Sequence, residues 1–124
     1  MSFERFTVVR VPFPFTDRNA TKNRPALVLS AADCFNTPIG HSVMAMITSA
    51  DNAPWPLDCV VGDLNAAGLP APSVVRFKLF TLDHRLVRGA LGALAPGDAS
   101  VVANRLQRLF ESPGEGVRSP SFRD

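Results

Sequence analysis

Residues 8–30 read VVRVPFPFTDRNATKNRPALVLS, and this stretch contains two predicted strands joined by a polar loop. In its first run every second residue is apolar, which predicts a strand with one face in a core. The alternating positions are Val9, Val11, Phe13 and Phe15. Pro12 and Pro14 fall on the opposite face and cannot donate ladder hydrogen bonds, so this end of the strand is expected at a sheet edge or a bulge. The second run, residues 25–29, is apolar without alternation, as expected of a strand buried on both faces.

The rest of the chain continues with short elements. We expect strands over residues 42–48, 58–62 and 73–79, because each run is apolar and is bounded by turn-forming residues. Residues 31–41 are expected to form a loop, and residues 82–94 fit either a strand or a helical turn. In the last of the strands, Val75, Phe77 and Leu79 should point to the core. Arg76 and Lys78 would then form an exposed basic pair on the other face.

One helix is predicted, over residues 96–110. Pro96 suits a first helical turn, and Asp98 lies where the helix dipole favours a negative charge. Its apolar stripe consists of Val101, Val102, Leu106, Leu109 and Phe110. Residues 111–124 are rich in Ser, Pro, Gly and charge, so we expect a flexible tail after a domain that spans residues 1–110. Several short strands and one C-terminal helix predict a mainly β fold, a small and strongly bent antiparallel barrel.

Composition limits the possible classes of protein. A chain of 124 residues with 46% hydrophobic and 19% charged residues is a single globular domain. It contains no apolar run long enough to span a membrane and no signal-peptide pattern at the N-terminus, so we expect a cytoplasmic protein. Cys34 and Cys59 are expected to be reduced. His41 and His84 lack partners at metal-ligand spacing, so no metal and no cofactor are expected.

The net charge of +2 is spread unevenly. Residues 1–24 carry five basic and two acidic side chains, residues 25–75 carry four acidic and no basic ones, and residues 76–110 carry six basic and two acidic ones. If folding brings the two basic regions together, they form a positive groove that suits a phosphate backbone. The alternative is that these charges are ordinary solvated surface.

Several motifs, in order along the chain, resemble the MazF/PemK family, the toxins of type II toxin–antitoxin pairs. They are VPFPFTD (11–17), KNRPALVLS (22–30), MITSA (46–50), AGLPAPSVVR (67–76), TLDHRLV (81–87) and LGAL (91–94). The resemblance covers about residues 6–110. The chain differs from the family at Phe6 and Thr7, where members often carry an acidic pair, and Lys78 lies near the place where some relatives carry a carboxylate.

The resemblance implies both a fold and an activity. The fold is the SH3-like antiparallel barrel (CcdB/PemK-like). The activity is that of an mRNA interferase, a metal-independent and sequence-specific endoribonuclease that cleaves single-stranded RNA to 2′,3′-cyclic phosphate and 5′-hydroxyl ends. The resemblance also implies a homodimer that is neutralised by a cognate antitoxin protein.

It further implies roles for individual residues. RNA supplies its own nucleophile, the 2′-hydroxyl, so the protein must position the chain and neutralise charge on the phosphate. Arg24 matches the catalytic arginine of the KxRP motif and should stabilise the phosphorane. Thr48 matches the threonine of the ITS motif and should bind the scissile phosphate. The expected substrate-binding residues are Lys22, Ser49, Trp55, Arg76 and Lys78.

Alternatives remain at the level of the sequence. Arg24 could instead pair with Asp17, Thr48 could be an ordinary strand threonine, and Trp55 could pack over the barrel rather than stack on a base. Arg76 and Lys78 could contact the antitoxin or only solvent. Two other functions are open: a non-catalytic toxin of the same fold that inhibits DNA gyrase, and a catalytically inactive RNA-binding relative.

Overall fold

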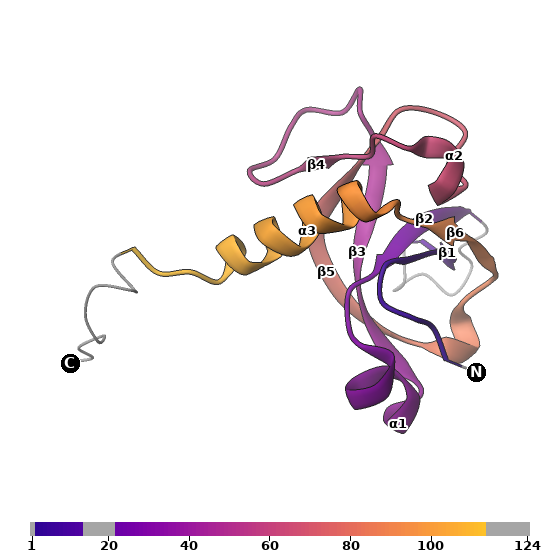
Figure 1. Ribbon diagram of the computed structural model, residues 1–124. Helices are drawn as coiled ribbons and strands as arrows, with labels where there is room; N and C mark the ends of the chain where they lie inside the picture. The colour runs from indigo at the N-terminus through magenta and orange to yellow at the C-terminus, as the bar shows by residue number, and fades with distance from the viewer. Residues whose placement is uncertain (1, 14–21, 114–124) are drawn as a thin grey trace.

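The computed structural model describes residues 2–13 and 22–113, and within these ranges the chain forms one curled antiparallel sheet (Figure 1). Six strands pair in the order β4-β5-β3-β2-β1-β6. The helix α3 (Pro96–Leu109) lies across the sheet, and its C-terminal half projects beyond it (Figure 1). The strands are β1 (Thr7–Pro12), β2 (Asn23–Val28), β3 (His41–Ser49), β4 (Cys59–Val60), β5 (Ser73–Asp83) and β6 (Ala90–Ala93). The predicted class, a mainly β antiparallel barrel with a C-terminal helix, is confirmed, and the sheet curls into a half-barrel.

Both strands of the opening stretch bury residues on both of their faces. Val8 and Leu27 belong to one hydrophobic cluster, which also contains Val102 of α3. Val9 belongs to a second cluster, which contains Leu82 of β5 although β3 and β2 lie between the two strands. Ala26 and Val28 of β2 and Met44 of β3 connect the two strands, so this cluster runs along one face of the sheet. The prediction for β2 is confirmed. The one-sided prediction for β1 is wrong at Val8, because α3 covers the face that was expected to be open.

The prolines of the opening stretch were expected at a sheet edge or a bulge. The ladder between β1 and β6 shifts register between Val8 and Val9 and ends at Val9. Val11 and Pro12 pair with β2. Pro12 therefore lies beyond the β6 ladder, as predicted. Pro14 and Phe15 fall outside the described residues.

A bulge interrupts the ladder of β5. The ladder between β3 and β5 shifts register after Ala45, which lies opposite Leu79, so that Met46 lies opposite Arg76. The two residues between them on β5, Phe77 and Lys78, are extra, and because two residues are one full period of a strand, odd and even positions keep their faces on both sides of the bulge. Arg76 is 9% exposed and Leu79 is 37% exposed. The predicted faces are confirmed for Val75 and Phe77, which pack in the core, and for Lys78, which is exposed. The prediction is wrong for Leu79, and it is wrong for Arg76, because the loop 50–58 covers that side chain.

Two further segments refine the sequence predictions. Residues 31–41, expected as a loop, contain a π-helical turn (Ala32–Asn36) and the short helix α1 (Thr37–Ile39). The buried Asn36 side chain holds this segment, because it donates hydrogen bonds to the carbonyls of Phe3 and Ser30 at 2.8 and 2.9 Å. Such a tertiary contact leaves no local pattern in the sequence. The ambiguous segment 82–94 contains both alternatives, a 3₁₀ turn (His84–Leu86) followed by β6.

The predicted helix agrees with α3, but its apolar stripe is only partly buried. Val102 is 1% exposed, whereas Val101 and Phe110 are 40% and 70% exposed. Residues 114–124, most of the predicted tail, lie outside the described part of the chain. Neither cysteine forms a disulfide within the described ranges. None of the described helices is long and apolar enough to cross a bilayer.

The helix α2 (Leu64–Ala67) shapes the chain just before β5. It ends at Gly68, whose φ of +72° is a left-handed conformation that favours glycine. A Cβ at this position would lie 2.1 Å from the carbonyl oxygen of Leu91, so no side chain fits there. Gly68 thus allows α2 to pack closely on β6 and turns the chain into residues 69–72.

Candidate functional site

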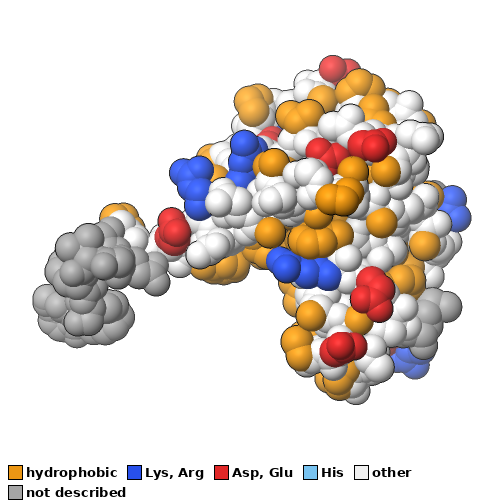
Figure 2. All heavy atoms as spheres, in the orientation of Figure 1, with side chains coloured by type: hydrophobic (Ala, Val, Ile, Leu, Met, Phe, Trp, Pro, Cys, Tyr) orange, Lys and Arg blue, Asp and Glu red, His pale blue; other side chains and the backbone are white. Residues whose placement is uncertain are grey.

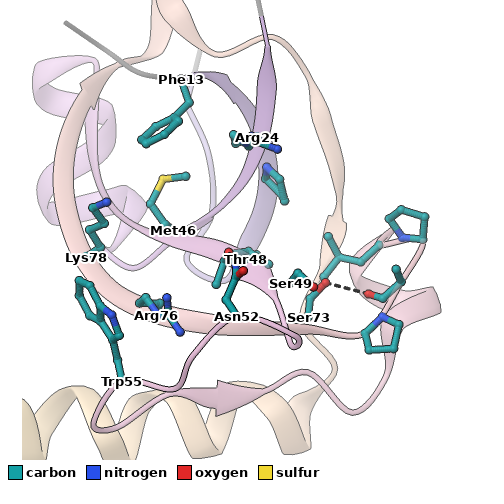
Figure 3. A pocket seen from close by; sticks show the side chains of 16 residues that line it. Phe13, Arg24, Met46, Thr48, Ser49, Asn52, Trp55, Ser73, Arg76 and Lys78 are labelled. Carbon is teal, nitrogen blue, oxygen red and sulfur yellow. Dashed lines mark hydrogen bonds between the residues drawn. The ribbon is translucent and has the colours of Figure 1, made fainter.

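A cleft of about 680 Å³ opens between the sheet and two loops, residues 50–58 and 69–72 (Figure 3). Six of the seven site residues predicted from the sequence line it: Arg24, Thr48, Ser49, Trp55, Arg76 and Lys78. Lys22 does not line the cleft, although its carbonyl accepts a hydrogen bond from the Phe13 amide at 3.1 Å. The fold therefore brings together residues that lie up to 54 positions apart in the sequence, from Arg24 to Lys78.

The cleft joins the two basic regions of the sequence. Arg24 comes from β2 in the N-terminal region, and Arg76 and Lys78 come from β5 in the second region. Among the described residues that line the cleft there is no Asp, Glu, His or Cys. By contrast, basic, acidic and hydrophobic side chains are interspersed on the face of the molecule that carries α3 (Figure 2). The cleft therefore presents positive charge to a ligand, and it suits a phosphodiester.

Arg24 is an exposed side chain near the start of β2. Its backbone is fixed by pairing with Val11 of β1. Within residues 2–13 and 22–113 no acidic side chain forms an ion pair with it, and the alternative partner Asp17 lies outside these residues. The guanidinium carries forked donors that match two oxygens of a phosphate. Arg24 thus combines a rigid strand with a side chain that a ligand can reach.

Thr48 lies at the end of β3 and is half-buried. The side-chain amide of Asn52 donates a hydrogen bond to its Oγ1 at 2.6 Å. The next residue, Ser49, accepts a hydrogen bond from the Asp51 amide at 3.1 Å. Asn52 also lines the cleft and was missed from the sequence, because an asparagine in a loop has the same appearance as a turn residue.

Arg76 is already engaged by the loop 50–58. Its guanidinium donates to the two carboxylate oxygens of Asp58 at 3.2 and 3.0 Å and to the carbonyl of Ala53 at 2.8 Å. It also lies 4.9 Å from the centre of the Trp55 ring. Burial tends to raise the pKa of Asp58, but the hydrogen bonds from Arg76 and from the Trp55 amide outweigh it and lower this pKa. The hydrogen bonds to Asp58 raise the pKa of Arg76. Asp58 was missed because no local pattern links it to Arg76.

Lys78 keeps a more open position. It is exposed, and its Nζ lies 5.7 Å from the centre of the Phe13 ring, which also lines the cleft. A cation at this distance from an aromatic face is weakly attracted to it, and its hydrogen-bond donors stay available. Lys78 therefore presents a positive charge that a ligand phosphate can contact.

The two histidines do not belong to this cleft. His41 lies near Asp83, at 3.9 Å, in a separate hollow of about 500 Å³ that Arg85 also lines. Hydrogen bonds from Arg85 hold the pKa of Asp83 well below its usual range. His84 is buried, with its Nε2 2.7 Å from the Ser42 hydroxyl. Among the described residues no group of His, Cys, Asp and Glu is placed to hold a metal ion.

Similar proteins agree with this architecture. The MazE–MazF complex of Deinococcus radiodurans (crystal form II) contains a chain with a TM-score of 0.67 and 22% identity, and the match covers 90% of this chain and 99% of that chain. An endoribonuclease from a mycobacterial species, in complex with its cognate antitoxin, has a TM-score of 0.68 and 17% identity, and the match covers 96% of this chain and 100% of that chain. The Mycobacterium tuberculosis toxin MazF-mt6 has a TM-score of 0.64 and 19% identity, and the match covers 84% of this chain and 95% of that chain. At these identities the likeness establishes the fold.

The sequence itself carries the family assignment. A comparison with curated proteins gave no match. The family model described as "PemK-like, MazF-like toxin of type II toxin-antitoxin system" matches residues 4–110, which include every described residue of the cleft. The resemblance predicted from the motifs is thereby confirmed, and the chain belongs to the PemK-like, MazF-like toxins of type II toxin–antitoxin systems.

Proposed function

We propose that this toxin is a metal-independent, sequence-specific endoribonuclease that cleaves single-stranded RNA in the cytoplasm. One observation carries the proposal: Arg24, Thr48 and Lys78 come from three different strands and line one cleft whose described lining holds no acidic side chain. RNA brings its own nucleophile and a charged backbone, so a cleft of hydroxyls and cations matches what its cleavage needs.

In the proposed reaction the 2′-oxygen attacks the adjacent phosphorus, and the bond from phosphorus to the 5′-oxygen breaks. The 2′-hydroxyl loses its proton and the departing 5′-oxygen gains one, which gives a 2′,3′-cyclic phosphate and a 5′-hydroxyl. Arg24 stabilises the charge that builds on the phosphorane oxygens, and Thr48 donates a hydrogen bond to the scissile phosphate. The residues present thus act by positioning and by charge stabilisation.

We further propose that the toxin is a homodimer that a cognate antitoxin neutralises. Membership of a toxin–antitoxin family supports both partners, and two of the similar structures are described as complexes with MazE or with a cognate antitoxin. A cleft with exposed cations also favours a partner that carries acidic side chains. The antitoxin would then compete with RNA for the same surface.

The decisive experiment is to incubate the purified protein with RNA of known sequence and to determine the sequence and chemistry of the ends. We expect 5′-hydroxyl and 2′,3′-cyclic phosphate ends at a recurring short motif, and cleavage by the Arg24→Ala variant that is slower by at least about 100-fold. A folded protein that arrests growth yet leaves RNA intact would contradict the proposal and would favour a toxin that acts by binding a protein.

A further inference from the structure

We propose that Trp55 is a nucleobase-stacking platform in the cleft, and that Arg76 and Asp58 hold it in place. In this assignment Arg76 is a positioning residue and does not bind phosphate. The inference rests on the proposed function in one respect, that the ligand of the cleft is a single-stranded nucleic acid.

The contacts of Arg76 all lead to the loop that carries Trp55. Its guanidinium donates to Asp58 through two nitrogens and to the carbonyl of Ala53. The Asp58 carboxylate in turn accepts a hydrogen bond from the Trp55 amide at 3.0 Å. One arginine on a strand of the sheet therefore ties three points of the loop 50–58. Pro54 and Pro56, on either side of Trp55, further restrict the backbone of the loop.

The charge of Arg76 is already paired with that of Asp58. The side chains of Arg76 and Asp58 are only 11% and 13% exposed, and they form an ion pair at 3.0 Å. A phosphate that took Arg76 would leave a largely buried carboxylate without its partner, which costs free energy. Lys78, two residues further along β5, is exposed and free of this cost. The phosphate-binding role predicted for the basic pair therefore falls to Lys78 alone.

Trp55 has the position that a stacking platform requires. Arg76 lies over its ring, yet 45% of the residue remains exposed and it lines the cleft. A tryptophan that only packed over the barrel would be expected to expose less of its surface, because tryptophan is highly buried on average. Figure 3 shows Trp55 beside Arg76 on the side of the cleft opposite Arg24. A strand whose scissile phosphate lies at Arg24 and Thr48 can then place a neighbouring base on the indole. A ring held in advance loses little freedom when a base stacks on it.

Trp55 is the single tryptophan of the chain, so its fluorescence reports on this position alone. We would titrate the protein with a short DNA oligonucleotide, which lacks the 2′-hydroxyl and cannot be cleaved. Saturable quenching is expected, and it should persist in the Arg24→Ala variant. Trp55→Phe keeps an aromatic face and Trp55→Leu keeps only apolar bulk. With a labelled oligonucleotide, the Leu variant should bind roughly 5- to 100-fold more weakly, as alanine substitution of stacked aromatics does, and the Phe variant should lose much less. An abasic oligonucleotide should bind the wild type and the Leu variant equally.

Arg76→Met and Lys78→Met separate positioning from phosphate binding. Arg76→Met should weaken binding and shift the Trp55 emission, but it should leave the dependence of affinity on salt unchanged. Lys78→Met should lower the salt slope by about 0.7, the value for one phosphate contact on a single strand. Val60→Thr, at an exposed position of β4 outside the cleft, is the control for the purified variants. Circular dichroism and thermal melts would show that each variant is folded.

The outcomes distinguish this inference from the proposed function. Equal affinity of Trp55→Leu and the wild type for the ordinary oligonucleotide, or a reduced salt slope in Arg76→Met, would overturn the platform even if RNA is cleaved. A folded protein that binds neither DNA nor RNA would overturn both proposals. RNA cleavage without any quenching of Trp55 would overturn the platform alone.

Discussion

The side-chain amide of Asn52 donates a hydrogen bond to the Thr48 hydroxyl at 2.6 Å. A hydroxyl has one donor and two acceptor positions. Because Asn52 occupies an acceptor position of Thr48, the O–H of Thr48 is left to donate elsewhere, and Thr48 lines the cleft. Asn52 thus orients the hydroxyl that the proposed mechanism directs at the scissile phosphate, and it is a positioning residue for Thr48.

Asn52→Ala should lower kcat/KM for RNA cleavage roughly 5- to 10-fold, the effect of one hydrogen bond of about 1 kcal/mol. Asn52→Asp should be worse, because a carboxylate accepts the Thr48 proton and repels the phosphate. The measurement is steady-state cleavage of a short fluorogenic RNA. A double-mutant cycle gives the control: in a Thr48→Val background, Asn52→Ala should lower kcat/KM little further. Fully additive losses would contradict a role through Thr48.

Arg24→Ala should lower kcat about 10²- to 10³-fold, the loss seen when one oxyanion donor is removed. The melting temperature should stay within a degree or two of the wild type, because Arg24 is exposed and contributes little to the core. Arg24→Lys keeps the charge without the forked donors, and it should recover only part of the rate. Single-turnover cleavage and a thermal melt of the same preparations test both points. Unchanged cleavage by the Ala variant would remove Arg24 from the site.

Local sequence patterns were sufficient to predict the strands that hold Arg24 and Thr48. Both sit at the ends of apolar runs whose length and composition predict strands, and the motifs around them predicted their place in the cleft. The burial of Arg76 could not be predicted, because it depends on the loop 50–58, whose Ala53 and Asp58 hold the guanidinium. A contact between a loop and a strand leaves no trace in the alternation of the strand alone.

The side-chain partners of the site residues could not be predicted from the sequence either. Asp58 lies 18 positions before Arg76, and its pairing arises only when the loop 50–58 folds over β5. Asn52 and Thr48 are close in sequence, but their hydrogen bond depends on the turn that brings residue 52 back toward β3. Side-chain contacts between a loop and a sheet are set by tertiary packing, so one sequence without its fold does not reveal them.

Cleavage should persist in excess EDTA. The described lining of the cleft contains no carboxylate, histidine or cysteine, so it offers Mg²⁺ and Zn²⁺ none of the side-chain ligands that they prefer. The test compares initial rates in EDTA with rates in added magnesium, at equal ionic strength, because salt alone weakens RNA binding. Activity that disappears with the chelator and returns with magnesium would contradict the proposed mechanism.

The ion pair of Asp58 and Arg76 predicts how stability depends on pH. Burial alone would raise the pKa of Asp58, but hydrogen bonds from Arg76 and from the Trp55 amide lower it below its ordinary value of 3.8. The folded state therefore favours the carboxylate. Its contribution to the free energy of unfolding is fully present above the ordinary pKa and is lost as the pH falls through the lowered one.

Asp58→Asn should accordingly be less stable than the wild type at pH 7, and the two urea midpoints should converge as the pH falls below about 4. Asp83, whose pKa is also lowered, is present in both proteins, so its contribution cancels in the comparison. The Asn variant should also show an altered Trp55 emission at pH 7, because it loses the acceptor that fixes the Trp55 amide. A stability difference that stays constant from pH 7 to pH 2 would mean that the charge of Asp58 does not hold this loop.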